Sequence, residues 1–467
     1  MYEKNIIPLL TGDYPDPTIV EFRGKFYMTH TAGRPLIWES EDLIHWTPLC
    51  RATDAFPNIA APELNKNGEK LFLFLSANDT NYVLTSDDMI HWTDPVDLKV
   101  GSIDPGYIYD RETGKQYLHI AAGGMAELGE DALTATPAKP NYTGWEFPRE
   151  WDVEGYLCVE APKLVYKAPY YYMTTAEGGT GGPSTSHMCV SARSLHPNGP
   201  WENSPYNPIV HCDSDEEQWW TKGHGTVVED HEGKWWMIYH AYEKGNHNLG
   251  RQTIMQPLKW TEDGWYVVDD SKDFSYIRPA HPPLSDDFQG EKLGWQWQFN
   301  RTIDYSKFSV GNGALTLRGQ GDHFKVSNLC GVAPMDKEYS TVVYMEPGDG
   351  AVGSFTYCYH TYEDRFMYSG FRYGNGTLYF RVDMYNRELV LPLPEAPKGL
   401  YLRMDKVRQN VRFYYSTDGE NWTKVEVSLD VTGYNHNVIG GYGAPRITLG
   451  AEGTGEVVFR RFRYTEK

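Results

Sequence analysis

The 467-residue sequence has no long hydrophobic run and no excess of positive charge. No apolar stretch approaches the roughly 20 residues that a membrane-spanning helix needs, so we expect no such helix. Lysine and arginine together number 43 against 63 aspartates and glutamates, which gives a net charge of −20. Because such a charge repels phosphate backbones and anionic lipid, we expect neither a nucleic-acid partner nor a membrane partner.

Cysteine is also scarce, and its spacing argues against a disulfide framework. No two of the six cysteines form a CxxC pair. A chain of this length can bury a core large enough to fold without disulfides, so we expect free, mostly buried thiols. The cysteines are Cys50, Cys158, Cys189, Cys212, Cys330 and Cys358.

The N-terminal segment lacks the apolar stretch of a secretory signal peptide. If residue 1 is the native start, we expect a cytoplasmic protein. If a signal peptide has been removed, we expect a periplasmic or secreted one.

Helical periodicity is scarce, whereas aromatic residues are abundant. They make up 14% of the chain, with 15 Trp, 34 Tyr and 18 Phe. This excludes a disordered chain, because disordered segments are poor in aromatic residues. Short alternating runs between turn residues predominate, which predicts an all-β protein.

One octapeptide pattern occurs twice. Ser40–Thr47 has the same pattern as Ser86–Thr93, which begins 46 residues later. A period of about 40–50 residues is typical of the four-stranded blades of a β-propeller.

A second pattern recurs in the same phase. A polar or acidic residue, often beside proline, opens a strand, and a tight turn and a strongly aromatic strand follow, as in a β-hairpin. Five copies predict a five-bladed β-propeller in residues 1–278. If the openings are innermost strands, their polar residues face the central channel together. These residues are Asp16, Glu63, Asp104, Glu160 and His224.

The chain changes character near residue 280. Pro279–Leu284 is a proline-rich, linker-like stretch. Short alternating runs separated by glycine-rich turns follow it, and this spacing is typical of a β-sandwich. We therefore predict a jelly-roll-like β-sandwich in residues 285–467 and an all-β chain of two domains.

Three carboxyl groups on one channel suit the hydrolysis of a glycosidic bond. Each alone has an ordinary structural explanation, since Asp-Pro is a common turn opener. Held together, Asp16, Asp104 and Glu160 cannot all ionise cheaply, so at least one pKa is raised. One protonated acid and one ionised base result, which is the pair that a glycosidase uses.

Several segments resemble motifs of glycoside hydrolase family 43. Three resemble its catalytic motifs and two match further motifs, in the order that the family has. Two more are similar to the β-xylosidase branch, whose chains carry a C-terminal sandwich. The segments are, in this order, Tyr14–Thr18, Ser102–Gly106, Val159–Leu164, Gly223–Gly225, Leu249–Thr253, Glu177–Gly181 and Ser285–Phe288.

The resemblance implies an inverting glycoside hydrolase. It would be exo-acting or debranching, on β-D-xylosides, α-L-arabinofuranosides or both, in plant-type oligosaccharides or polysaccharides. By motif position, Asp16 would be the general base and Glu160 the general acid. Asp104 would tune the pKa of the acid and orient it, and Arg251 would bind sugar hydroxyls in the deepest subsite.

Three further residues are candidates for substrate binding. They are Glu63, His187 and Trp219. Trp219 and its neighbour Trp220 either stack on a sugar face or pack between blades. Ala60 stands where the family usually has tryptophan, so an aromatic platform is missing there.

The resemblance also bears on metal binding at His224. In many family members the matching histidine faces an axial cation, usually calcium, mostly through waters. Calcium prefers oxygen ligands, so a lone histidine is an unusual direct ligand. Calcium, sodium and an empty channel are all compatible with the sequence, and we expect no organic cofactor.

The predicted sandwich has three candidate roles. In the resembling branch, a loop of this domain closes one end of the active site, and Asp322–Phe324 is our candidate for it. Sugar binding and a purely structural role are the alternatives.

Two other functions compete with the hydrolase. A non-catalytic carbohydrate-binding propeller-sandwich protein would not need both Asp16 and Glu160. A retaining relative that acts on fructosides would need Asn-Asp-Pro and Arg-Asp-Pro motifs. Here Asp16 follows Tyr14-Pro15 and Asp104 follows Ser102-Ile103, which argues against it.

Overall fold

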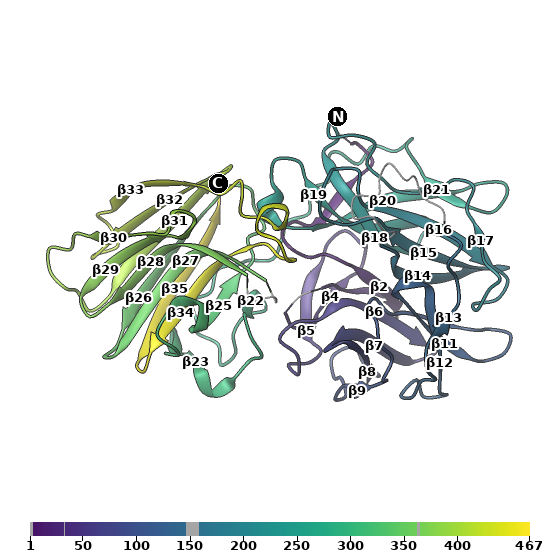
Figure 1. Ribbon diagram of the computed structural model, residues 1–467, viewed down its shortest axis with the longest axis horizontal. Helices are drawn as coiled ribbons and strands as arrows, with labels where there is room; N and C mark the ends of the chain where they lie inside the picture. Colours follow the sequence, from purple (N-terminus) through teal and green to yellow (C-terminus); the bar gives the residue numbers. More distant parts are fainter. Residues whose placement is uncertain (1–2, 32, 146–157, 362–364) are drawn as a thin grey trace. The chain divides into compact units, whose positions relative to one another are not determined.

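β-Strands form nearly all the regular structure in the computed structural model (Figure 1). The structure describes residues 3–31, 33–145, 158–361 and 365–467. Within these residues the α-helix α1 is a single turn, His436–Ile439. No helix in this part of the chain combines the length and hydrophobicity of a membrane span.

The chain divides into two compact units. The first consists of Met1–Lys244 and Arg251–His281, and the second of Gly245–Gly250 and Pro282–Lys467. The change near residue 280 is the one that the proline-rich stretch indicates. The sequence pattern does not indicate that Gly245–Gly250, which contains the short 3-10 helix η3 (His247–Leu249), groups with the second unit.

Five antiparallel sheets form the blades of a propeller in the first unit. In blades 1 to 4, four strands pair in sequence order. Blade 1 is β2 Thr18–Phe22, β3 Lys25–Thr29, β4 Leu36–Ser40 and β5 Thr47–Arg51; blade 2 is β6 Ala60–Asn67, β7 Lys70–Ala77, β8 Thr80–Ser86 and β9 Val96–Asp97. Blade 3 is β10 Gly106–Tyr109, β11 Gln116–Ile120, β12 Gly124–Leu128 and β13 Lys139–Pro140; blade 4 is β14 Glu160–Lys167, β15 Tyr170–Glu177, β16 Met188–Ser194 and β17 Glu202–Asn203.

Blade 5 joins the two ends of the propeller chain. Its order is β18-β19-β20-β1, so the N-terminal strand pairs with β20, and Ile7 lies opposite Met255. A further strand, β21, also pairs with β20. The strands are β18 Trp219–Glu229, β19 Trp235–Glu243, β20 Gln252–Trp260, β21 Tyr266–Val268 and β1 Ile7–Leu10.

The aromatic and aliphatic runs form inner strands because each blade is covered on both faces. In β7, Leu71 and Leu73 pack in one cluster with residues of blade 1, whereas Phe72 packs in another with Tyr107 of blade 3. A strand buried on both faces is a continuous apolar run rather than an alternating one. The blades therefore stack through side chains that the sequence presents as uninterrupted hydrophobic segments.

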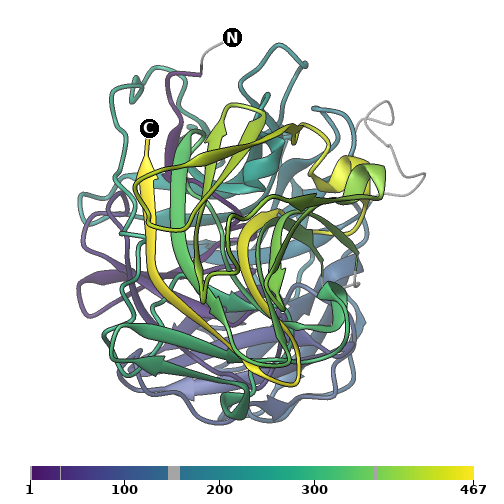
Figure 2. The same cartoon turned by 90° about the vertical axis from the view of Figure 1, so that its left-hand side faces the viewer.

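Two seven-stranded sheets form the second unit, a β-sandwich. Its last strand, β35, is long and yellow in Figures 1 and 2. One sheet has the order β22 Trp297–Phe299, β25 Asn328–Val332, β34 Pro445–Gly453, β27 Ala351–His360, β28 Phe366–Gly374, β29 Thr377–Val382 and β30 Arg387–Leu391. The other has β23 Phe308–Gly311, β24 Ala314–Arg318, β35 Glu456–Glu466, β26 Tyr339–Pro347, β31 Leu400–Val407, β32 Asn410–Ser416 and β33 Thr423–Asp430.

The predicted fold class is confirmed. The chain is all-β, with a five-bladed propeller followed by a sandwich. All six cysteines are free thiols, and four of them are buried. In the candidate closing segment Asp322–Phe324, the first two residues are exposed and Phe324 stacks on Tyr368 inside the sandwich. A role of this segment at the active site stays a prediction.

Candidate active site

Each blade has a residue in the left-handed conformation within its innermost strand or two positions before it. These residues have φ between +34° and +58°, and none of them is glycine. In four blades the next residue is proline, and in blade 5 it is Gly225. The five residues are Asp16, Ala61, Asp104, Ala161 and His224.

This register corrects the phase that we predicted for two residues. Glu160 comes one position before the left-handed residue of blade 4, and Glu63 comes two positions after that of blade 2. A bulge separates Ala60 from Glu63 in β6, and another separates Glu160 from Lys163 in β14. Glu160 is therefore equivalent to Ala60, and Glu63 is equivalent to Lys163.

Asp16 is buried among nitrogen atoms. Its Oδ1 lies 3.2 Å from Arg251 Nη1, 3.3 Å from His224 Nδ1 and 3.0 Å from His240 Nδ1. Burial alone would raise the pKa of Asp16, but its neighbours, led by the Arg251 guanidinium, hold the pKa well below the usual range. Asp16 is therefore ionised at neutral pH, as a general base must be.

Asp104 has the opposite electrostatic balance. Burial, and next the negative charge of Asp16, raise the pKa of Asp104 to about 7. The Lys163 ammonium and a hydrogen bond from the Ala161 N–H to Oδ2, at 3.1 Å, act against this rise. Asp104 thus changes protonation near neutral pH, while Asp16 does not.

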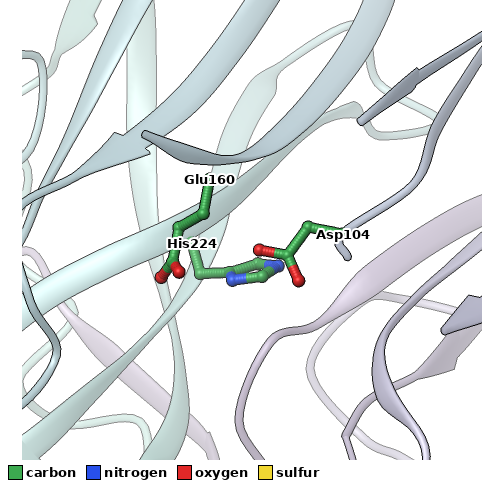
Figure 3. A group of neighbouring side chains, drawn as sticks. All are labelled: Asp104, Glu160 and His224. Carbon is green, nitrogen blue, oxygen red and sulfur yellow. The ribbon is translucent and has the colours of Figure 1, made fainter. Parts of the chain in front are cut away.

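Glu160 is the most exposed of the three carboxyl groups. Its side chain is 27% exposed, against 8% for Asp16. Asp104, Glu160 and His224 point toward one another from three blades, with one donor atom of each within 4.8 Å of the others (Figure 3). Asp104 and Glu160 therefore meet beside His224, which also lies against Asp16, and Glu160 is the carboxyl group most open to solvent.

His187 lies against Glu160. The ring is buried, its Nδ1–H donates to the Gly178 carbonyl at 2.6 Å, and its Nε2 lies 3.8 Å from Glu160 Oε1. Burial lowers the pKa of His187 to about 3, so the ring is neutral and Nε2 is an acceptor facing the carboxyl group. Gly223 makes room for the ring, because a Cβ there would lie 1.8 Å from His187 Cδ2.

Two predicted substrate-binding residues are buried. Trp219 is 4% exposed and packs in the hydrophobic cluster of blade 5, so it offers no open face to a sugar. Glu63 is 3% exposed, and its carboxylate accepts from Thr18 Oγ1, Asn65 Nδ2 and Lys163 Nζ. Trp219 is therefore a core residue, which corrects the prediction that it stacks on a sugar. Glu63 lies within the channel, and its role in substrate binding stays a prediction.

The side chains near His224 do not by themselves complete a calcium site. Asp104, Glu160 and His224 offer two carboxylates and one imidazole, whereas calcium takes six to eight oxygen ligands. Asp104 Oδ2 already accepts the Ala161 N–H, and the Lys163 ammonium lies within electrostatic range of Asp104 and His224. His224 Nε2 is buried with no hydrogen-bond partner in the described chain. We therefore assign no step of the reaction to a metal ion.

His240 and Lys163 are site residues that the sequence pattern did not indicate. His240 Nδ1 accepts the Asp16 N–H at 3.2 Å, and its Nε2 lies 3.0 Å from Thr180 Oγ1. One signal was available for His240, a polar residue in the otherwise apolar strand β19. Lys163 stands two positions after Ala161, and Glu63 stands two positions after Ala61. The two residues are equivalent because β14 and β6 have a bulge at the same place, which the sequence does not reveal.

Comparisons with known proteins agree with the fold and with the order of the motifs. The non-reducing end α-L-arabinofuranosidase BoGH43B of Bacteroides ovatus is 28% identical over an alignment of 361 positions that covers 69% of this chain and 66% of that protein. The β-xylosidase of Bacillus subtilis is 24% identical over 98% of this chain and 99% of its own length.

A solved structure has the same two-unit fold. The chain superposes on the GH43 protein BlXynB of Bacillus licheniformis with a TM-score of 0.84, at 23% identity, over 99% of this chain and 100% of that one. A model of the family "Glycosyl hydrolases family 43" matches residues 6–266, more than half of the chain. Together with the carboxyl groups that meet in the channel, this match shows that the chain is a glycosidase and belongs to glycosyl hydrolases family 43.

Proposed function

We propose that this glycosidase is inverting and exo-acting, and that it removes terminal β-D-xylosyl or α-L-arabinofuranosyl residues from plant-type oligosaccharides or polysaccharide side chains. The observation that carries the proposal is the contrast within one channel between Asp16, which is held ionised, and Asp104, whose pKa is raised to about 7. Relatives that are named for β-xylosidase and arabinofuranosidase activity support the choice of substrate.

In this mechanism Asp16 acts on the water. Its carboxylate accepts a proton from a water molecule as the water oxygen bonds to the anomeric carbon. Arg251 keeps Asp16 ionised and fixes Oδ1, and the His240 ring fixes the backbone of the same residue. A low pKa makes a weak base, but it ensures that the base is deprotonated over the working pH range.

Glu160 acts on the leaving group. As the glycosidic bond breaks, Glu160 donates its proton to the departing oxygen. The neutral His187 ring faces this carboxyl group, with Nε2 3.8 Å from Glu160 Oε1. Asp104 is close enough to repel a second negative charge on Glu160 and to orient it. After one turnover, Asp16 has gained a proton and Glu160 has lost one, and solvent restores both.

A panel of nitrophenyl glycosides tests the proposal. We expect hydrolysis of the β-D-xyloside or the α-L-arabinofuranoside and little of the β-D-galactoside. Proton NMR of the first sugar released should show the anomer opposite to that of the substrate. Asp16→Asn and Glu160→Gln should each lower kcat by at least about a hundredfold, since each removes one arm of acid–base catalysis.

Two results would overturn the proposal. One is retention of configuration, which would mean a covalent intermediate. The other is binding of xylo- or arabino-oligosaccharides without hydrolysis of any substrate tried, together with unchanged binding by the Asp16→Asn, Glu160→Gln double variant. That second result would favour the non-catalytic carbohydrate-binding alternative.

A further inference from the structure

The propeller channel contains a buried ion pair next to the active-site carboxyl groups. Lys163 Nζ lies 3.0 Å from Glu63 Oε2, and the two side chains are 3% and 4% exposed. The ammonium also donates to the carbonyl oxygens of Pro62, at 2.9 Å, and Pro105, at 3.1 Å. These three acceptors match the three N–H donors of an ammonium, so the charge has a fixed place.

The strand register explains how Lys163 reaches these oxygens. Lys163 and Glu63 occupy equivalent positions, two residues after the left-handed residues of blades 4 and 2. Blade 3, which lies between them in the chain, has Gly106 at this position. A Cβ on Gly106 would lie 1.5 Å from the Pro162 carbonyl oxygen, so only glycine permits the close approach of β10 and β14. The lysine side chain can then extend to oxygens of blades 2 and 3.

Burying the Lys163 ammonium costs desolvation free energy. The groups that its charge acts on therefore indicate its role. The ammonium lowers the pKa of Asp104, against the effects of burial and of Asp16, and it also lowers the pKa of His224. It carries the sign of charge that a channel cation would carry. Its ligands, two carbonyl oxygens and a carboxylate, are of the type that a metal cation would use.

We propose that Lys163 is the resident cation of the propeller channel, and that it supplies without a metal ion the positive charge that keeps Asp104 and His224 in their working states. Lys163 is thus a positioning residue, which acts on catalysis through Asp104 and His224. This inference rests on the proposed hydrolase function for its kinetic consequences. Its consequence for metal binding is independent of that function.

Chelation of the wild-type protein is the first test. After treatment with EDTA and dialysis, we expect kcat and the melting temperature to be the same with and without added calcium. Loss of activity on chelation with recovery on adding calcium would overturn the proposal. So would a rise in the melting temperature of the EDTA-treated protein with calcium, and this second measurement needs no activity.

Removal of the charge is the second test. Lys163→Met keeps the length of the side chain, and we expect kcat to fall at least about tenfold with a much smaller change in KM. Because the ammonium lowers the pKa of Asp104, the limb of the pH–rate profile that follows Asp104 should move to higher pH. Lys66→Met is the matched control, since Lys66 Nζ pairs with Glu21 Oε2 at 2.8 Å in a partly exposed ion pair between blades 2 and 1. Its pH profile should equal that of the wild type.

Chemical rescue separates charge from structure. Lys163→Ala leaves a space beside Glu63, and added methylammonium should restore part of the lost kcat, whereas it should not affect the wild type or Lys66→Met. If Lys163→Met does not fold, the double variant Glu63→Gln, Lys163→Met removes both charges and should fold better than the single variant.

An unchanged pH profile in a folded Lys163 variant would overturn the proposal. If no substrate is hydrolysed, the proposed function fails, and the calcium measurement still decides whether Lys163 replaces a metal.

Discussion

At the scale of single residues, Asp16 and Asp104 show how position within one channel gives the same side chain two different acidities. Both are buried, and both lie two positions before the inner strand of a blade. Asp16 lies against the Arg251 guanidinium, so its pKa falls. For Asp104, burial and next the charge of Asp16 outweigh the opposing charge of Lys163, so its pKa rises. Neither direction follows from the motif, which is Asp-Pro in both cases.

The raised pKa of Asp104 predicts that the free energy of unfolding falls as the pH rises toward neutral. In the folded protein Asp104 binds its proton more tightly than in the unfolded chain. Its favourable contribution is complete below about pH 4, the unfolded pKa, and is lost as the pH rises through about 7. Asp104→Asn abolishes this loss. We expect the free energy of unfolding of the variant, relative to wild type, to improve by about 2–4 kcal/mol between pH 4.5 and pH 8.

Urea unfolding of both proteins at the two pH values measures this difference. Asp110→Asn is a control, because the pKa of Asp110 is lowered and not raised, so its relative stability should change in the opposite direction or not at all. Parallel stability curves for the wild type and Asp104→Asn would contradict the prediction.

At the scale of elements, each blade has one left-handed residue in its inner strand or two positions before it, and this residue turns the backbone at the active site. At Asp16, Asp104 and His224 the residue that takes this conformation is itself a channel residue. In blade 4 the corresponding residue is Ala161, which instead donates its N–H to Asp104. This arrangement places Glu160 one position earlier. Sequence alone did not reveal the bulge, so our alignment assigned Glu63 and Glu160 to one phase.

The conformation of Ala161 can be tested by substitution. A β-branched side chain is strained in the left-handed region, and Ala161 is fully buried. Ala161→Val should lower the free energy of unfolding by about 2–3 kcal/mol and reduce kcat, because the N–H to Asp104 is displaced. Ala161→Gly suits this conformation and should retain kcat within a few-fold. Equal kcat and equal stability of Ala161→Val and wild type would contradict this account.

The octapeptide that first indicated a propeller is a local turn. In both copies an aspartate, Asp42 or Asp88, accepts hydrogen bonds from backbone N–H groups two and three residues later. Asp418 makes the same turn between β32 and β33 of the sandwich. The turn therefore connects antiparallel strands in either unit. Its repetition at a blade-length interval, together with the strand openings, is what predicted the propeller.

At the scale of the whole molecule, the architecture and the three carboxyl residues could be predicted from the sequence. Many of the contacts that hold these residues in place could not. Repeats and strand signals are local in sequence, and they suffice for a fold made of hairpins. The contacts of Lys163 with Glu63 and of His240 with Asp16 join residues 100 and 224 positions apart. A lysine after proline suggests an exposed residue until the register places it in the channel.

Because β1 closes the propeller, we expect substitutions in this strand to lower the free energy of unfolding more than substitutions in the outer strands of other blades. Ile7 is fully buried in the outer strand of blade 5, whereas Val96, in the outer strand of blade 2, is 36% exposed. Ile7→Ala should lower the free energy of unfolding by about 2–4 kcal/mol, and Val96→Ala by less than about 1 kcal/mol. Chemical denaturation of the two variants measures the difference. Similar losses would mean that β1 contributes no more than an ordinary edge strand.

The pairing of β1 with β20 also has a consequence for synthesis on the ribosome. Ile7 is translated about 250 residues before its partner Met255. At about 5–20 residues per second, the nascent chain must hold an apolar first strand without its final neighbour for some tens of seconds. The early blades can form as they emerge, but the circle stays open until blade 5 is complete. Chaperone binding to nascent β1 would therefore be most useful during that interval.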